Sequence, residues 1–222
     1  MRMRRKSRLE ERISDCDRHL IYVETSDFYQ KSEDEKFRII SYEEIFGNDN
    51  PVWLDLGCGK GNFAIDLAEK LKGINVIGVE KISNVLIEGL EKVKILDPDN
   101  CMFLNCGVEN LKYYIPKHSI ERIFLNFSCP YPKNTYKNRR LTYERYLKLY
   151  KYLLTQNGDI CLKTDNMKFF EFSLESFSQN GFKIRNVSLD LHNSDFKENI
   201  ETDYEKIFAA KGQPIYRVEA YL

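Results

Sequence analysis

Three glycines and two acidic residues form the stretch whose spacing is most typical of a ligand site. Gly57, Gly59 and Gly61 follow an apolar run, where glycine lets the backbone pass close to a ligand without a Cβ clash. Asp55 precedes them, where a carboxylate suits a cationic amine better than a pyrophosphate. Glu80 ends the next apolar run about twenty residues on, the place of an acceptor for ribose hydroxyls. The pattern favours S-adenosylmethionine over a dinucleotide, although a glycine turn can also simply join a strand to a helix.

A cysteine holds a second position with a potential for chemistry. In the stretch NFSCPYPKN, Cys129 follows an apolar run and precedes a Pro-Tyr-Pro turn and Lys133. A thiol there could be a nucleophile, but direct transfer of a methyl group needs no covalent enzyme intermediate. We therefore interpret Cys129 as a small neutral side chain that lets the turn keep its shape. Tyr131 offers an aromatic face for stacking a base or for packing the loop.

Basic side chains are concentrated in two runs of a chain whose charges balance. Lysine plus arginine and aspartate plus glutamate number 34 each, so composition alone gives no case for a nucleic-acid partner. Residues 1–8 and residues 133–140, however, contain basic side chains and no acid. Such patches steer a polyanion to one face of a protein, although a solvated surface is the plain alternative. The side chains expected to contact such a polyanion are the N-terminal arginines, Lys133, Lys137, Arg139 and Arg140.

The length of 222 residues fits one domain with appendages. Residues 1–50 lack a regular rhythm and are predicted to be an N-terminal extension, a basic arm that faces RNA, before a domain over 51–222. No apolar stretch is long enough to span a bilayer, so we expect a cytoplasmic protein. The six cysteines include no CxxC pair and are expected to be reduced. No metal site is predicted.

Strands and helices alternate from residue 51 onward. Apolar runs predict seven strands, over 51–57, 75–80, 102–106, 122–127, 159–164, 182–191 and 216–222. Apolar positions at helical spacing predict helices over 62–72, 83–96, 142–154 and 169–181. This alternation predicts a mostly parallel sheet with helices on both faces. Ligands bind beyond the carboxyl ends of such strands, so the glycine turn, Glu80 and Cys129 are predicted to share one edge.

Longer motifs resemble those of a known family. The stretch NFSCPYPKNTYKNRRLTYERYL (126–147) resembles the signature of the bacterial tRNA (guanine-N7-)-methyltransferases. That signature reads Asn-Phe, then Ser or Pro, then Asp-Pro-Trp-Pro-Lys, a basic run and Arg-Arg-Leu. Further matches are the opening MRMR, KTDN (163–166), SLDLHNS (188–194), TDYEKIF (202–208) and GQPIYR (212–217). The resemblance therefore covers nearly the whole chain, in order.

The resemblance implies an α/β fold, the Rossmann-like class I methyltransferase fold with a mostly parallel seven-stranded sheet. It also implies S-adenosylmethionine as methyl donor and a guanosine in the variable loop of tRNA as acceptor, with the basic runs facing the tRNA. We expect a monomer or homodimer. The implied cofactor contacts are Asp55, Gly57, Gly59, Glu80, Gly107 and Cys129. The implied guanosine contacts are Lys133, Asp165, Thr202, Asp203, Tyr204 and Glu205. The chain departs from the family at Gly107 and Cys129, where the family has carboxylates.

Guanine N7 carries a lone pair and no proton, so its methylation needs no general base. Positioning of the reactants can lower the activation barrier by about 7–11 kcal/mol in favourable cases. A nearby carboxylate favours the cationic product ring. The family aspartate at the catalytic position is Cys129 here, and its loss is expected to slow the reaction rather than abolish it.

Two alternatives stay open. One is a tRNA-binding homologue with weakened or lost catalysis, for which Gly107 and Cys129 are the evidence. The other is an amino-group methyltransferase, because the loop after residue 126 also resembles one that grips exocyclic amines; the basic run 133–140 and the match at 202–205 argue against it. Residues 202–205 also read as a capping box that any helix could carry.

Overall fold

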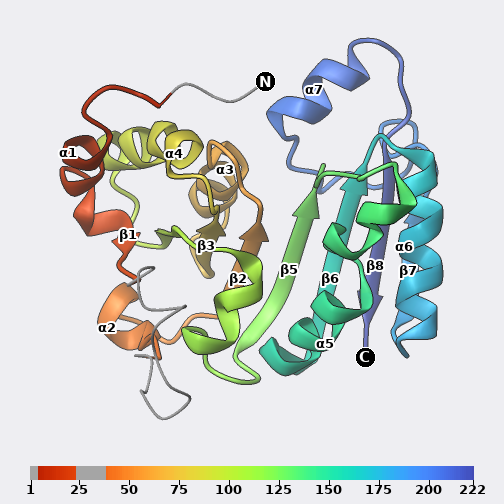
Figure 1. Cartoon of the computed structure of the whole chain (residues 1–222), viewed down its shortest axis with the longest axis horizontal. Helices are drawn as coiled ribbons and strands as arrows, with labels where there is room; N and C mark the ends of the chain where they lie inside the picture. Colours follow the sequence, from red (N-terminus) through yellow and green to blue (C-terminus); the bar gives the residue numbers. More distant parts are fainter. Residues whose placement is uncertain (1–4, 24–38) are drawn as a thin grey trace.

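The computed structural model describes residues 5–23 and 39–222, and within these ranges its centre is one sheet of eight strands (Figure 1). The sheet order is β1-β4-β3-β2-β5-β6-β8-β7. The bounds are β1 Leu20–Ile21, β2 Val52–Leu56, β3 Asn75–Val79, β4 Cys101–Leu104, β5 Ile120–Asn126, β6 Leu154–Thr164, β7 Lys183–Ser188 and β8 Tyr216–Tyr221. Neighbours from β1 to β6 are parallel, and β8 runs antiparallel to β6 and β7. The predicted mostly parallel sheet is confirmed, and β1 adds a strand to the seven that were predicted.

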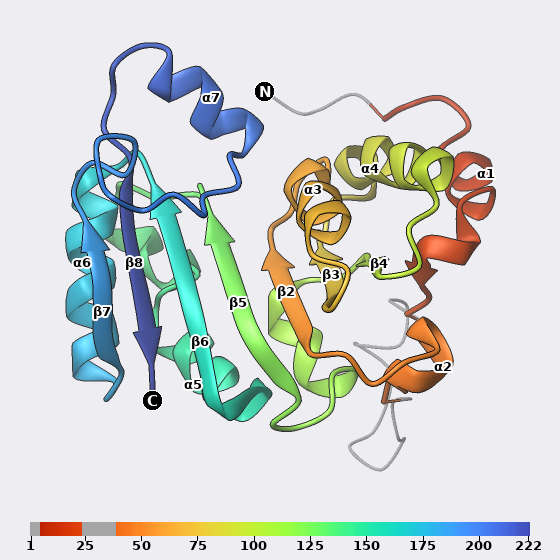
Figure 2. The same cartoon turned by 180° about the vertical axis from the view of Figure 1, so that it is seen from behind.

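Helices cover the two faces of the sheet in separate groups (Figures 1 and 2). The α-helices are α1 Leu9–Ser14, α2 Tyr42–Phe46, α3 Asn62–Lys70, α4 Ser83–Leu96, α5 Glu144–Leu153, α6 Met167–Gln179 and α7 Asp203–Ala209. Short 3₁₀ helices are η1 Asp17–His19, η3 Val108–Tyr113 and η4 Asn134–Arg139. α1, α3 and α4 pack on one face and α5 and α6 on the other, and the buried side chains of the central strands divide between these two apolar layers. The edge where β2, β3 and β5 end is thereby held between two apolar layers.

The described part of the predicted N-terminal extension is built onto the sheet. β1 pairs with β4, and His19 is buried with its Nδ1 3.0 Å from the carbonyl oxygen of Cys101. Arg12 of α1 donates to both carboxylate oxygens of Glu91 on α4, at 2.7 and 2.8 Å. Residues 5–23 therefore extend the sheet by one strand and pack α1 against α4. Arg2 and Arg4 of the first basic run lie outside the described residues.

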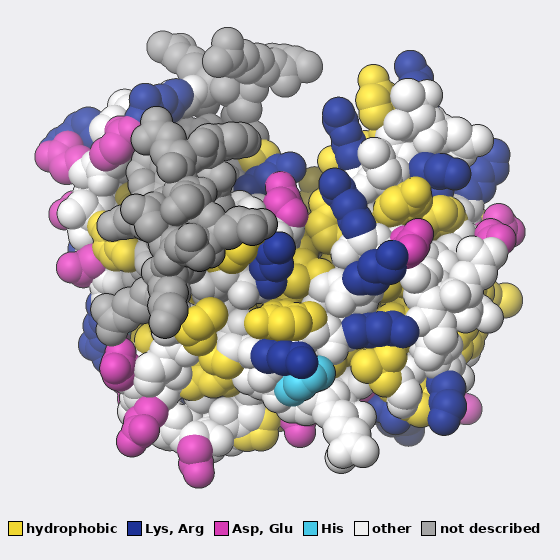
Figure 3. Space-filling view, turned by 60° about the horizontal axis from the view of Figure 1, so that its bottom comes forward, with side chains coloured by type: hydrophobic (Ala, Val, Ile, Leu, Met, Phe, Trp, Pro, Cys, Tyr) yellow, Lys and Arg dark blue, Asp and Glu magenta, His cyan; other side chains and the backbone are white. Residues whose placement is uncertain are grey.

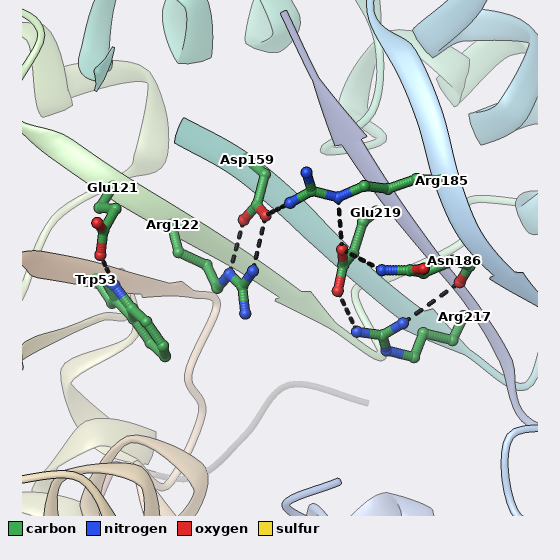
Figure 4. A network of polar contacts seen from close by, with 8 residues as sticks. All are labelled: Trp53, Glu121, Arg122, Asp159, Arg185, Asn186, Arg217 and Glu219. Carbon is green, nitrogen blue, oxygen red and sulfur yellow. Dashed lines mark hydrogen bonds and ion pairs between the residues drawn. The ribbon is translucent and has the colours of Figure 1, made fainter. Parts of the chain in front are cut away.

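The strands β5, β6, β8 and β7 show an open face in Figure 2, where no helix of the described chain lies over them. Ion pairs join the strands there (Figure 4). Arg122 donates to both oxygens of Asp159 at 2.7 Å, and Arg185 donates to Asp159 at 2.6 Å and to Glu219 at 2.9 Å. Arg217 also donates to Glu219. Both carboxylates are nearly inaccessible, so this open-face network pairs each buried negative charge with arginine.

Neither a membrane span nor a metal centre occurs in the part of the chain that the structure describes. Its helices are too short or too polar to cross a bilayer, and its His, Cys, Asp and Glu side chains form no group that could hold a metal ion. All the cysteines carry free thiols, in agreement with the prediction of reduced cysteines.

Candidate active site

A cleft of about 440 Å³ opens at the carboxyl ends of the strands, beside α7. In Figure 1, α7 stands above the ends of β5 and β6. The glycine turn after β2 forms one wall, and the first turns of α7 form the opposite wall. The predicted site residues that the cleft brings together are Asp55, Gly57, Gly59, Thr202, Asp203 and Tyr204. Residues from both ends of the domain therefore meet at the edge that the sequence indicated.

The glycine turn has a backbone conformation that favours glycine. Gly57 and Gly59 have φ of 75° and 59°, and at Gly61 (φ 73°) an added Cβ would lie 2.6 Å from the ring of Phe103. The backbone N–H of Gly57 donates to the carbonyl oxygen of Val79 at 2.8 Å, which fastens the turn to the end of β3. Left-handed φ is costly for residues with a side chain, so the turn depends on glycine.

Glu80 lies next to the turn, as its position after β3 predicted. One of its carboxylate oxygens accepts a long hydrogen bond from the N–H of Gly59 (3.3 Å), and the other accepts from the N–H of Ile82 (2.8 Å). The side chain of Asn105 donates to the carbonyl oxygen of Glu80. A carboxylate has about four acceptor sites, so two backbone donors hold Glu80 while leaving it capacity for a ligand's hydroxyls.

Asp55 is a buried carboxylate whose hydrogen bonding from the described chain is weak. It is 2% exposed, and its described side-chain hydrogen bond comes from Asn126 at 3.5 Å. Burial raises the pKa of Asp55 to about 7, although the bond from Asn126 and the charge of Lys163 oppose the rise. Within residues 5–23 and 39–222, the Oδ1 of Asn126, which lines the cleft together with Asp55, has no hydrogen-bond partner. A ligand that brings a cationic amine to this point would satisfy groups that the chain leaves unsatisfied.

Aromatic rings from two distant segments meet at the cleft. Phe127 follows β5 with a left-handed φ of 48°, and its ring lies nearly parallel to those of Tyr204 and Phe208 on α7. The centroid distances are 6.3 and 6.4 Å. The sequence places Phe127 in the segment 126–133 at the predicted ligand edge without an individual role, and it gives Phe208 no role, although both fall within motifs of the resemblance. A strained backbone beside a cleft is typical of functional sites.

Arg140 supports the Pro-Tyr-Pro turn from below. It is 8% exposed, and its guanidinium donates to the carbonyl oxygens of Pro130 (2.9 Å) and Tyr131 (3.0 Å). The same group lies 4.3 Å from the ring centroid of Phe172. The expectation that Arg140 contacts RNA phosphate is therefore wrong, because its donors are directed into the protein. Tyr131 itself has a left-handed φ of 40°, which these bonds help to hold.

Cys129, Lys133 and Asp165 lie at the same edge but are not part of the described cleft wall. All three are exposed. Cys129 and Lys133 belong to the loop after β5, and Asp165 to the turn between β6 and α6. Their position suits contact with a large substrate that covers the cleft rather than with a ligand enclosed in it.

Gly107 has a carboxylate beside it from a different residue. A Cβ added to Gly107 would lie 2.8 Å from the carboxyl carbon of Glu109. The Glu109 side chain thus occupies the space into which a longer residue at position 107 would extend. Glu109 lies within the segment 106–109, which the sequence places at the predicted ligand edge after the third strand, but no individual role was predicted for its side chain.

The segment 202–205 divides between the cleft and the interior. The capping box is confirmed: the hydroxyl of Thr202 accepts from the N–H of Glu205 at 3.0 Å, and the Glu205 carboxylate accepts from the N–H of Thr202 at 3.4 Å. Glu205 is fully buried, whereas Asp203 and Tyr204 are exposed and line the cleft. Asp203 also accepts a hydrogen bond from Asn62 at the start of α3.

Basic side chains of the described structure are spread over more than the predicted runs. Lys137 and Arg139 of η4 are exposed, in the loop beside the cleft. Figure 3 shows the lower face, toward the amino ends of the parallel strands, where Lys and Arg also gather among hydrophobic side chains. Another hollow, of about 320 Å³, lies between α3, the open face and the segment 196–200. The predicted site residues do not line it, so we assign the chemistry to the cleft.

The comparisons with known proteins agree with this arrangement. Residues 49–218 match a family model described as "Putative methyltransferase". A tRNA (guanine-N(7)-)-methyltransferase of Geobacillus sp. (strain WCH70) is 42% identical over 99% of this chain and 94% of its own. The enzyme of the same name from Streptococcus sanguinis (strain SK36) is 47% identical over 81% of this chain and 84% of its own.

Solved structures share the fold at low identity. "Structure of an Antibiotic Related Methyltransferase" matches with a TM-score of 0.61 at 20% identity, over 81% of this chain and 92% of that one. A 30S ribosomal A1408 methyltransferase from an uncultured bacterium matches with a TM-score of 0.54 at 15% identity, over 80% and 90%. The sheet and helices are thus those of class I methyltransferases, and with relatives at this level of identity the chain belongs to the tRNA (guanine-N(7)-)-methyltransferase family.

Proposed function

We propose that this protein transfers a methyl group from S-adenosylmethionine to N7 of a guanosine in the variable loop of tRNA. The observation that carries the proposal is the similarity to enzymes of that name, 42% identical over nearly the full length of both chains. The cleft supports it, since it joins the glycine turn to the segment 202–204 at one edge of the sheet. tRNA is then the partner and the cytoplasm the compartment, with the enzyme a monomer or homodimer.

The residues of the cleft fit the cofactor. Asp55 and the unsatisfied Oδ1 of Asn126 would meet the amino-acid tail, and Glu80 would accept hydrogen bonds from the ribose. The ammonium would hold Asp55 ionised, because an adjacent positive charge lowers a carboxyl pKa that burial has raised. Glu109, beside Gly107, supplies a carboxylate at the end of β4.

For the chemical step, the chain must align the purine with the methyl group and provide an electrostatic field that favours the cationic product ring. When bound, S-adenosylmethionine supplies a methyl group on a positively charged sulfur, and N7 attacks it without losing a proton. The rings of Phe127 and Tyr204 would orient the purine, and the exposed carboxylate of Asp203 would favour the ring that becomes cationic. Lys133 and Asp165 would contact the guanosine from outside the cleft, and Lys137 and Arg139 the phosphates of the tRNA.

The test is a chemical analysis of tRNA after incubation. A tRNA transcript with guanosine in its variable loop is incubated with the protein and methyl-labelled S-adenosylmethionine, then digested to nucleosides and separated by chromatography. We expect label in N7-methylguanosine, and none with a transcript in which that guanosine is replaced by adenosine. Label in an N-methylated exocyclic amine would support an amino-group methyltransferase. Binding of the tRNA without any labelled nucleoside would support the homologue with lost catalysis.

A further inference from the structure

A buried lysine and a buried glutamate meet at the base of α7. Lys163 comes from β6 and Glu205 from the first turn of α7, and their side chains are 3% and 0% exposed. The Nζ of Lys163 lies 2.7 Å from Oε2 of Glu205. A charge removed from water is stable in a protein interior only when it is paired, so each of these groups depends on the other.

The Lys163 ammonium has an acceptor for each of its hydrogens. Besides Glu205, it donates to the carbonyl oxygen of Ile200 at 2.8 Å and to Oδ1 of Asn199 at 3.1 Å. An ammonium group has three donors, and all three are used. Lys163 thereby connects β6 to α7 and to the segment that leads into α7.

The Glu205 carboxylate is also held by several groups of the chain. Oε2 accepts from Lys163 and from the N–H of Thr202, and Oε1 accepts from Nδ2 of Asn199 and lies 3.2 Å from Nε2 of His192. Three of the about four acceptor sites of the carboxylate therefore hold hydrogen bonds from the chain. These bonds tie the first turn of α7 to β6 and to the segment before α7.

The pair fixes a wall of the cleft. Asp203 and Tyr204, directly before Glu205, line the cleft from α7. On the other side, Lys163 Nζ lies 5.3 Å from the ring centroid of Phe63, which lines the cleft from α3. The ion pair therefore sets the distance between α7 and the sheet, and with it the shape of the cleft.

We propose that Lys163 is a positioning residue, which holds α7 against the cleft through Glu205. Glu205 is then the counter-ion of Lys163. The choice of ligand rests on the proposed function, and the positioning of α7 is tested with the cofactor product alone.

The test compares Lys163→Met, Glu205→Gln and the double variant that carries both. Calorimetry measures the affinity for S-adenosylhomocysteine, and steady-state kinetics separate kcat from KM. Each single change leaves one buried group without its partner, so we expect at least a tenfold loss of affinity for S-adenosylhomocysteine. For Lys163→Met we also expect a raised KM for S-adenosylmethionine, with kcat within about threefold. The double change removes both charges, and we expect the affinity to return to within about threefold of native.

A double variant no better than the weaker single variant in S-adenosylhomocysteine affinity would overturn the positioning role. If a single variant fails to fold by circular dichroism, the double variant still decides, because it buries no unpaired charge.

Asp203→Asn is the matched control on the same turn of α7. Its side chain faces the cleft, so we expect it to raise the KM for tRNA with no recovery when Lys163→Met is added. The affinity for S-adenosylhomocysteine needs no tRNA. A native protein that makes no N7-methylguanosine would therefore refute the proposed function, while the recovery of affinity in the double variant would still support or overturn the positioning role.

Discussion

Asp55 and Glu219 are both buried carboxylates on the central sheet, Asp55 beneath the cleft and Glu219 in the open-face network. Asp55 has a long bond from Asn126, and burial raises its pKa to about 7. Burial also raises the pKa of Glu219, but hydrogen bonds from Arg185 and Asn186 and the charge of Arg217 outweigh it, so the net shift is downward. The chain supplies the positive charges around Glu219, and we propose that a ligand supplies the positive charge for Asp55. The source of the opposite charge would then distinguish a structural carboxylate from a binding one.

Removal of Glu219 tests the carboxylate that serves the structure, and it is expected to have the largest effect. Glu219→Ala removes an acceptor from both Arg185 and Arg217, while Arg185 keeps Asp159 and Arg217 keeps the carbonyl oxygen of Asn186. Loss of one partner of a buried ion pair costs about 3–5 kcal/mol. Because Arg185 is partly exposed, we expect a loss of about 3 kcal/mol in the free energy of unfolding, measured with urea. Glu171→Ala, an exposed acid on α6, is the control and should change little. A weakened affinity for S-adenosylhomocysteine in a folded Glu219 variant would contradict the division.

Removal of the Asp55 charge tests the carboxylate at the cleft. Asp55→Asn should weaken S-adenosylhomocysteine binding by more than tenfold, about 1.4 kcal/mol or greater, in calorimetry. The same change should raise the stability of the ligand-free protein at pH 8, because a carboxylate no longer has to ionise without a partner. An affinity equal to that of the native protein would remove the basis for placing the amine at Asp55.

Titration of Asp55 sharpens the comparison without a mutation. Ionised Asp55 attracts the ammonium, so affinity should fall as pH drops from 8 to 6, through the folded pKa of about 7, by about fivefold to tenfold. The stability of the ligand-free protein should change in the opposite sense. A raised carboxyl pKa contributes stability that is present below the ordinary value of 3.8 and is lost as pH rises through about 7. Asp55→Asn should abolish both dependences, and persistence of either would mean that another group titrates.

Glu109 tests whether a carboxylate can be supplied from a neighbouring position. Glu109→Ala should weaken S-adenosylhomocysteine binding by about threefold to fivefold, a size typical of an exposed contact. Adding Gly107→Asp should restore the affinity, because the aspartate would then occupy the space that the Glu109 carboxylate fills. If the affinity stays native in Glu109→Ala, the carboxylate near Gly107 has no part in binding.

Substitution of Cys129 is expected to have the smallest effect, on the rate of methyl transfer. Cys129→Ala should keep the rate of methyl transfer within about threefold, and Cys129→Asp should equal or exceed the native rate, because a carboxylate favours the cationic product ring. The measurement is single-turnover transfer to tRNA at saturating cofactor, which isolates the chemical step. A loss of more than about a thousandfold in the alanine variant would mean that the thiol takes part in the chemistry.

Much of the sheet, and of the helices that cover it, follows from local sequence. Apolar runs and helical spacing predict the seven longer strands, and the carboxyl edge of a parallel sheet predicts that the glycine turn and Glu80 meet. β1 escapes prediction because two residues are too few to show a period. Its pairing with β4 depends on how the segment 5–23 packs on α4.

The partners of individual side chains do not follow from local sequence. Lys163 and Glu205 are 42 residues apart, and their pairing exists only because α7 folds back over β6. Arg140 belongs to a run of basic residues that reads as one solvated patch, yet its guanidinium is turned into the loop before it. Charge and motif give the type of residue at a site, whereas burial decides whether it faces a ligand or the chain.

The position of β8 has a consequence for how the protein is made. β8 follows β7 in the chain but lies between β7 and β6, so β7 has no strand to pair with until residues 216–221 have been synthesised. Until then the edge of β6 is also unpaired, and such an edge is prone to join other chains. Glu219 and Arg217 arrive on the same strand, so the open-face network closes last, together with the sheet. A nascent chain on the ribosome would therefore expose β6, and slow release of this segment should favour aggregation over folding.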